Sequence, residues 1–118
     1  MKKISIYHFN NRHNELLRAL NFYKQEVGIL RDRLTEIAGR NTANEVLKQV
    51  EHFENQFRIQ SNNINKLKND IRVRVVNNGV IDERLMANHD MLEQSFASEE
   101  RVVNELRNEF NSFSAEYM

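Results

Sequence analysis

The side chains best suited to chemistry are two histidines, His13 and His89, which fall among the apolar positions of two predicted helices. If the helices pack side by side, both histidines come to one end of the molecule, beside Asp70 or Ile71. Two imidazoles and a carboxylate can bind a divalent metal. However, neither histidine belongs to a metal-binding motif, and the Glu-x-x-His signature of ferritin-like sites is absent. We therefore expect buried, hydrogen-bonded histidines and no resident cofactor, with a metal site at His13 and His89 as the weaker alternative.

A second group of chemically capable residues lies in the middle of the predicted helices. When the helix ends on either side of each predicted loop are placed level, Tyr23, Gln60 and Glu99 fall at one height. A buried glutamate is costly unless it is paired or protonated, and a glutamine amide or a tyrosine hydroxyl can pair with it. We expect a buried polar layer that fixes the register of the helices, as a core Asn does in coiled coils. A ligand-accessible site is the alternative.

Signs of catalysis are otherwise missing. The sequence has no glycine-rich phosphate loop, and its serines are not matched with a histidine and an acid at motif spacing. It has no cysteine, which excludes disulfides, thiolate metal sites and thiol nucleophiles. We expect a protein that is not an enzyme.

The charges disfavour nucleic acid as a partner. The chain has 17 basic and 17 acidic side chains, whereas nucleic-acid binders usually show a basic excess. A phosphate-binding or nucleic-acid-binding function of one basic end stays open as an alternative. The favoured explanation is that cations at the end of a helix complement its dipole. The basic residues expected at this end are Lys2, Lys3, Arg12, Arg18, Lys66, Lys68, Arg72, Arg74 and Arg84.

Three segments must position these side chains, and each repeats apolar residues at alternating intervals of four and three. That spacing is typical of a helix that packs on its neighbours along one stripe. The first stripe is Phe9, His13, Leu16, Leu20, Tyr23, Val27, Leu30, Leu34 and Ile37. The second is Val46, Val50, Phe53, Phe57, Gln60, Ile64, Leu67, Ile71 and Arg74. The third is Leu85, His89, Leu92, Phe96, Glu99, Val103, Leu106, Phe110, Phe113 and Tyr117.

These stripes predict one all-α domain, 1–118, with helices over 8–38, 43–77 and 82–117. Gly39 and the Asn77-Asn78-Gly79 segment are stop signals, and Thr42 with Glu45 forms a candidate capping box. Short connections make successive helices antiparallel, so we expect an up-down-up three-helix bundle with coiled-coil-like packing. Its layout resembles that of spectrin-type repeats, without a shared motif.

A small β-hairpin near 71–81 is the alternative fold for one segment. Ile71, Val73 and Val75 alternate with arginines, and Asn78-Gly79 is a favoured hairpin turn. The four-three spacing runs through Ile71, which favours a helix there.

Three apolar residues lie outside the stripes: Phe22, Ile29 and Ile59. Each directly precedes the second core position of its heptad, which is the column lettered c, next to column g. If the first two helices meet through their g columns, all three flank one groove. We therefore expect a helical module that binds a protein partner or a second copy of itself through these residues. No run of about 18 apolar residues is present, so we expect no membrane span and a cytoplasmic location.

Overall fold

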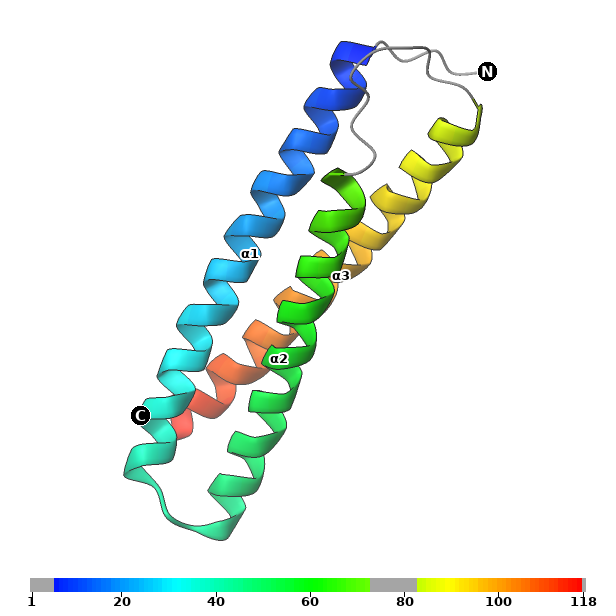
Figure 1. Ribbon diagram of the computed structural model, residues 1–118. Helices are drawn as coiled ribbons and strands as arrows, with labels where there is room; N and C mark the ends of the chain where they lie inside the picture. Colours follow the sequence, from blue (N-terminus) through cyan, green and yellow to red (C-terminus); the bar gives the residue numbers. More distant parts are fainter. Residues whose placement is uncertain (1–5, 73–82, 118) are drawn as a thin grey trace.

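The computed structural model describes residues 6–72 and 83–117, with side chains from 7 to 72 and from 86 to 117. It contains three helices, α1 (Ile6–Arg40), α2 (Asn44–Arg72) and α3 (Glu83–Tyr117), and each packs on the other two. Figure 1 shows an elongated bundle in which α2 runs opposite to α1 and α3. Its extents are 59 × 20 × 18 Å. The predicted all-α, up-down-up three-helix bundle is confirmed, while strict knobs-into-holes packing stays a prediction.

The core consists of the predicted four-three stripes. Of the stripe positions whose side chains are described, nearly all are buried, and Tyr23, Val50 and Tyr117 are partly buried against the others. The end near the loop between α1 and α2 is rich in aromatic rings, which pack in tilted, edge-on and stacked contacts with centroids 5.0–6.1 Å apart. Such offset geometries suit the ring quadrupoles. These rings belong to Phe53, Phe57, Phe110, Phe113 and Tyr117.

The boundary between α1 and α2 differs from the predicted capping. Gly39 is still helical, and α1 ends at Arg40. The Asn41 side-chain amide donates to the carbonyl oxygen of Ile37 at 2.8 Å, which satisfies one of the carbonyls left open at a helix end. The first backbone bond of α2 runs from Leu47 N–H to the carbonyl of Ala43. The helix thus begins one residue too late for Thr42 to cap it, and that prediction was wrong.

The predicted hairpin near 71–81 is settled only at its start. Ile71 and Arg72 are the last residues of α2, and Ile71 is fully buried, as the helical stripe predicts. Residues 73–81, and the predicted helical segments 73–77 and 82, lie outside the described residues.

Ion pairs show which side of each helix meets which neighbour. Arg31 donates to Glu54 at 2.6 Å, and both directly follow a stripe residue, in the column lettered e. The e columns of α1 and α2 therefore face each other. Arg12 pairs with Glu93 at 2.6 Å and Glu26 with Arg107 at 2.8 Å, which joins the g column of α1 to the e column of α3.

The remaining contact joins α2 to α3 through their g columns. Asn63 and Asp70, which directly precede stripe residues of α2, line one groove together with Ser95 of α3. The outward sides of α1 are consequently its b, c and f columns. No helix among the described residues is long and apolar enough to cross a membrane.

Candidate functional site

A buried polar pair occupies the middle of the bundle. Gln60 and Glu99 keep 5 % and 8 % of their surface exposed. With its amide nitrogen turned toward the carboxylate, Gln60 donates to both Glu99 oxygens, at 3.1 and 2.6 Å. Burial raises the pKa of Glu99 from its ordinary value of 4.5 to about 7. The structure thus brings these two predicted residues together at the expected height.

Tyr23, the third predicted member of this layer, is partly buried but bonds elsewhere. Its hydroxyl donates to Glu100 at 2.5 Å, in the groove between α1 and α3. Burial and the bond to Glu100 raise the pKa of Tyr23 to about 12. The layer therefore splits into the pair Gln60–Glu99 and the pair Tyr23–Glu100. Sequence reasoning missed Glu100, because it lies in column e of α3 and not on the stripe.

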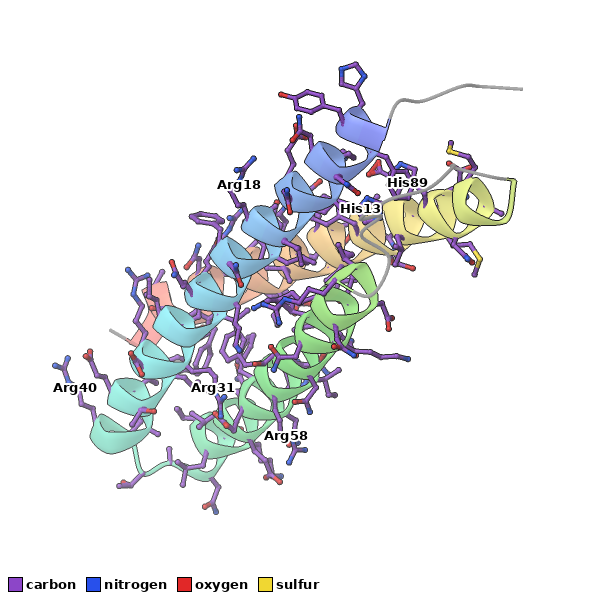
Figure 2. The ribbon with its side chains drawn as sticks, turned by 45° about the horizontal axis from the view of Figure 1, so that its top comes forward. His13, Arg18, Arg31, Arg40, Arg58 and His89 are labelled. Atoms are coloured by element: carbon purple, nitrogen blue, oxygen red, sulfur yellow. The ribbon has the colours of Figure 1, made fainter. Side chains whose placement is uncertain are left out.

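His13 and His89 lie side by side near the end of the bundle where α1 and α3 begin, as predicted (Figure 2). Their ring centroids are 5.1 Å apart, and the Phe9 ring lies 4.4 Å from His13 and 5.1 Å from His89. His13 is fully buried and its Nδ1 lies 2.8 Å from the carbonyl oxygen of Phe9. Because a carbonyl can only accept, Nδ1 carries the proton and donates.

Each ring has one nitrogen without a partner among the described residues. Nε2 of His13 and Nδ1 of His89 are buried and make no hydrogen bond within that part of the chain. Burial lowers the pKa of His13 from its ordinary value of 6.5, and the nearby His89 lowers it further, against the opposing effects of the Phe9 carbonyl and Glu93. His13 is therefore a neutral core histidine near neutral pH.

The metal alternative lacks a third ligand among the described residues. No group of three or more His, Asp or Glu side chains in 7–72 and 86–117 is close enough to hold an ion. Asp70, the predicted third ligand, lines the groove between α2 and α3 together with Lys66 and Glu99.

At the predicted basic end, some cations are paired with carboxylates and others lie close to one another. Arg12 is bound by Glu93 and Glu15. Lys68 has its pKa lowered by burial and by the neighbouring charges of Lys24 and Arg72, so these three cations do lie near one another. No other feature of the described surface indicates a phosphate ligand, and the nucleic-acid alternative stays a prediction.

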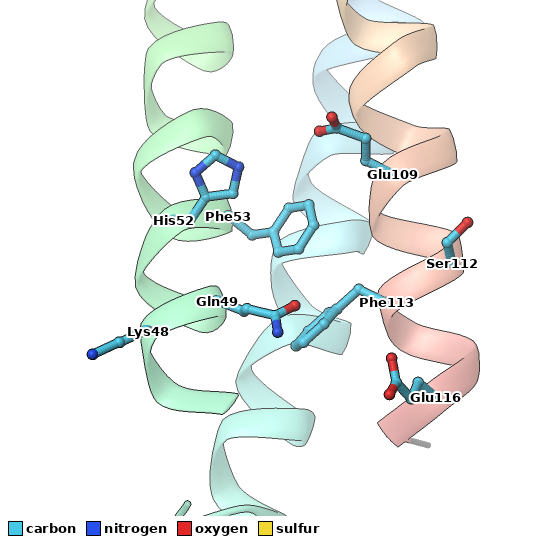
Figure 3. Close-up of a pocket in the computed structure, with 8 residues that line it drawn as sticks. All are labelled: Lys48, Gln49, His52, Phe53, Glu109, Ser112, Phe113 and Glu116. Carbon is cyan, nitrogen blue, oxygen red and sulfur yellow. The ribbon is translucent and has the colours of Figure 1, made fainter. Parts of the chain in front are cut away.

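One surface groove lies between α2 and α3, near the end of α3 (Figure 3). Its volume is about 590 Å³, its floor is formed by Phe53 and Phe113, and its rim is polar. In Figure 3 Lys48 points away from the groove, while the Phe53 and Phe113 rings lie between the helices. The rim mixes acidic Glu109 and Glu116 with His52, so its charge does not select one class of ligand.

The predicted partner residues are exposed but do not share one groove. Phe22, Ile29 and Ile59 keep 60 %, 55 % and 43 % of their surface exposed. Because α1 meets α2 through its e column, the c column of α1 lies on the side of α3. The c column of α2 likewise lies on the side of α3, so Ile59 flanks a different groove. The predicted common groove was wrong, since it assumed that the first two helices meet through their g columns.

Phe22 and Ile29 belong to a second four-three stripe that sequence reasoning missed. It consists of Arg18, Phe22, Gln25, Ile29, Asp32 and Glu36, all of them exposed. The spacing that located the core could have located this stripe as well. We call these six residues the outer stripe.

Comparison with protein-family models, with curated proteins and with solved structures finds no match for this chain.

Proposed function

We propose that this protein is a non-enzymatic helical interaction module, and that the outer stripe of α1 is its binding face. The observation that supports this best is the exposure of Phe22 and Ile29, two large apolar side chains two helical turns apart on one face. Seven residues span about 10.5 Å along a helix, so one partner helix can contact both. A single exposed apolar residue needs no explanation, but an aligned pair indicates an interface.

The surroundings of the pair support the same proposal. The Phe22 ring packs edge-on against the Tyr23 ring with centroids 5.7 Å apart, and the Tyr23 hydroxyl is held by Glu100. Phe22 is therefore braced by a side chain that the bundle itself holds in place. A braced aromatic ring loses little conformational freedom on binding, which is how interface anchors gain affinity.

The test is site-specific photo-crosslinking in cells of the native host. A photoreactive phenylalanine analogue at position 22 or 29 should give discrete adducts, whether with the protein itself or with another chain. The same analogue at Arg58 or Arg101, both exposed on other faces, is the matched control. Adducts from 22 and 29 that do not exceed those from the control positions would overturn the proposal.

A further inference from the structure

The outer stripe has an ordered charge pattern around its apolar centre. Arg18 lies four residues before Phe22, and Asp32 lies three residues after Ile29. Both are exposed, and neither makes an ion pair with any side chain in the described part of the chain. In Figure 2 Arg18 points outward from α1, away from α2 and α3. A cation and an anion without ion-pair partners among the described residues thus flank an apolar pair on one helix face.

Two copies of this charge pattern are complementary only when their α1 helices run antiparallel. When two copies of α1 run antiparallel about a twofold axis near Gln25, Phe22 of one lies level with Ile29 of the other. The same alignment brings Arg18 of each copy to within one residue of the level of Asp32 of the other, and Gln25 to within one residue of the level of its own counterpart. A parallel pair would instead set Arg18 against Arg18 and Asp32 against Asp32, and like charges repel.

We infer that the partner of the outer stripe is a second copy of this chain, bound antiparallel through α1 by Phe22–Ile29 contacts and Arg18–Asp32 ion pairs. A twofold contact of this kind is closed and self-complementary, so association stops at a dimer. The inference rests on the proposed function and names its partner.

The rest of the stripe is compatible with that contact. Glu36 of one copy comes level with Glu15 of the other, a residue just before the outer stripe, and Glu15 is already bound by Arg12 at 3.1 Å. Both lie about ten residues from the axis, roughly 15 Å along the helix, and outside the apolar centre. The two large apolar side chains per copy are a small contact compared with a permanent dimer, so the association is weak and depends on concentration.

The test is sedimentation of the wild-type chain and of charge-reversal variants, from about 10 μM to about 1 mM, a range that brackets weak affinities. The wild type should approach the mass of two chains at the top of this range. Arg18→Asp and Asp32→Arg should each weaken association at least tenfold, because each sets like charges across the axis. The double variant R18D/D32R should recover most of the wild-type association, since both pairs are restored with reversed sign.

Controls separate this contact from other causes. Arg101→Asp, an equal charge change on the exposed face of α3, should leave association unchanged. All variants should keep wild-type helical content by circular dichroism, because the changed side chains are exposed. A single introduced cysteine reports direction cleanly, since the native chain has none. A mixture of Arg18→Cys and Asp32→Cys chains should form mainly mixed disulfide dimers, with few from either chain alone.

The outcomes that would overturn the inference are specific. They are a monomeric wild type at the highest concentration, no recovery in R18D/D32R, or disulfide dimers of Arg18→Cys alone. If the wild type is monomeric but position 22 still crosslinks to another protein, the proposed function stands. Only the inference that the partner is a second copy of this chain is then overturned. A monomeric wild type together with no excess crosslinking from positions 22 and 29 would overturn both the dimer and the proposed function.

Discussion

Gln60 and Glu99 meet at the middle of the bundle, where the glutamine amide nitrogen donates to both oxygens of the carboxylate. A single amide supplies both of these bonds, whereas an ionised carboxylate has about four acceptor sites. Burial of the carboxyl group raises the pKa of Glu99 to about 7. We therefore expect the stability contributed by the middle of the bundle to depend on pH in the neutral range.

The first prediction concerns Glu99→Gln. Because the folded pKa of Glu99 lies above its ordinary value of 4.5, its contribution to stability is complete below that value and is lost as the pH rises through about 7. The Glu99 contribution to wild-type stability should fall between pH 5 and pH 8, and the variant should lack this contribution to the pH dependence. At pH 8 Glu99→Gln should be more stable by about 1–3 kcal/mol, measured by urea unfolding. Glu105→Gln, an exposed control, should behave as the wild type does.

The second prediction concerns His13→Leu. The contribution of His13 to stability changes with pH in the direction opposite to that of Glu99. Burial lowers the pKa of His13 below 6.5, so its contribution to stability is present above that value and is lost as the pH falls. The variant should lose less stability than the wild type between pH 7 and pH 5, in thermal unfolding at each pH. His52→Leu, at an exposed histidine, is the matched control for replacing a histidine by leucine. An equal loss of stability in acid for the wild type and His13→Leu would contradict a lowered pKa of His13.

The third prediction separates the core from the outer stripe. Phe57 is fully buried among aromatic rings, so Phe57→Ala should destabilise the fold by about 3–5 kcal/mol. Phe22→Ala should cost less than about 0.5 kcal/mol at dilute concentration, because its ring is mostly in water already. Urea unfolding of both variants checks this. A large cost for Phe22→Ala would place that ring in the core and remove it from the binding face.

The fourth prediction concerns the ion pair between α1 and α3. Glu26 is the less exposed partner of Arg107, at 15 % of its side chain against 36 %, and the two are 2.8 Å apart. A double-mutant cycle with Glu26→Gln and Arg107→Ala should give a coupling of about 0.5–1 kcal/mol, which weakens in high salt. The same cycle on Arg31 and Glu54, both more exposed, should give a smaller value. Equal couplings would show that burial does not set the strength of these pairs.

The stripes determined the helices, their core faces and the level of Gln60 with Glu99, because each of these follows from local periodicity. A helix repeats its faces every 3.6 residues whatever it packs against, and short connections leave little freedom in register. His13 and His89 came together for the same reason. Reading along the chain was therefore enough to place the buried polar residues at their heights.

Only the tertiary structure decided which flank of each helix meets which neighbour. Two bundles of opposite handedness bury the same stripes. The e and g columns of this chain are mainly polar, and each holds a few apolar residues, such as Leu17 and Leu47 in e and Val102 in g. The apolar pattern therefore does not select one handedness. The choice is made by pairs such as Arg31 with Glu54 and Glu26 with Arg107, which join residues far apart in sequence. That choice placed Ile59 beside a different groove from Phe22 and left the outer stripe of α1 uncovered.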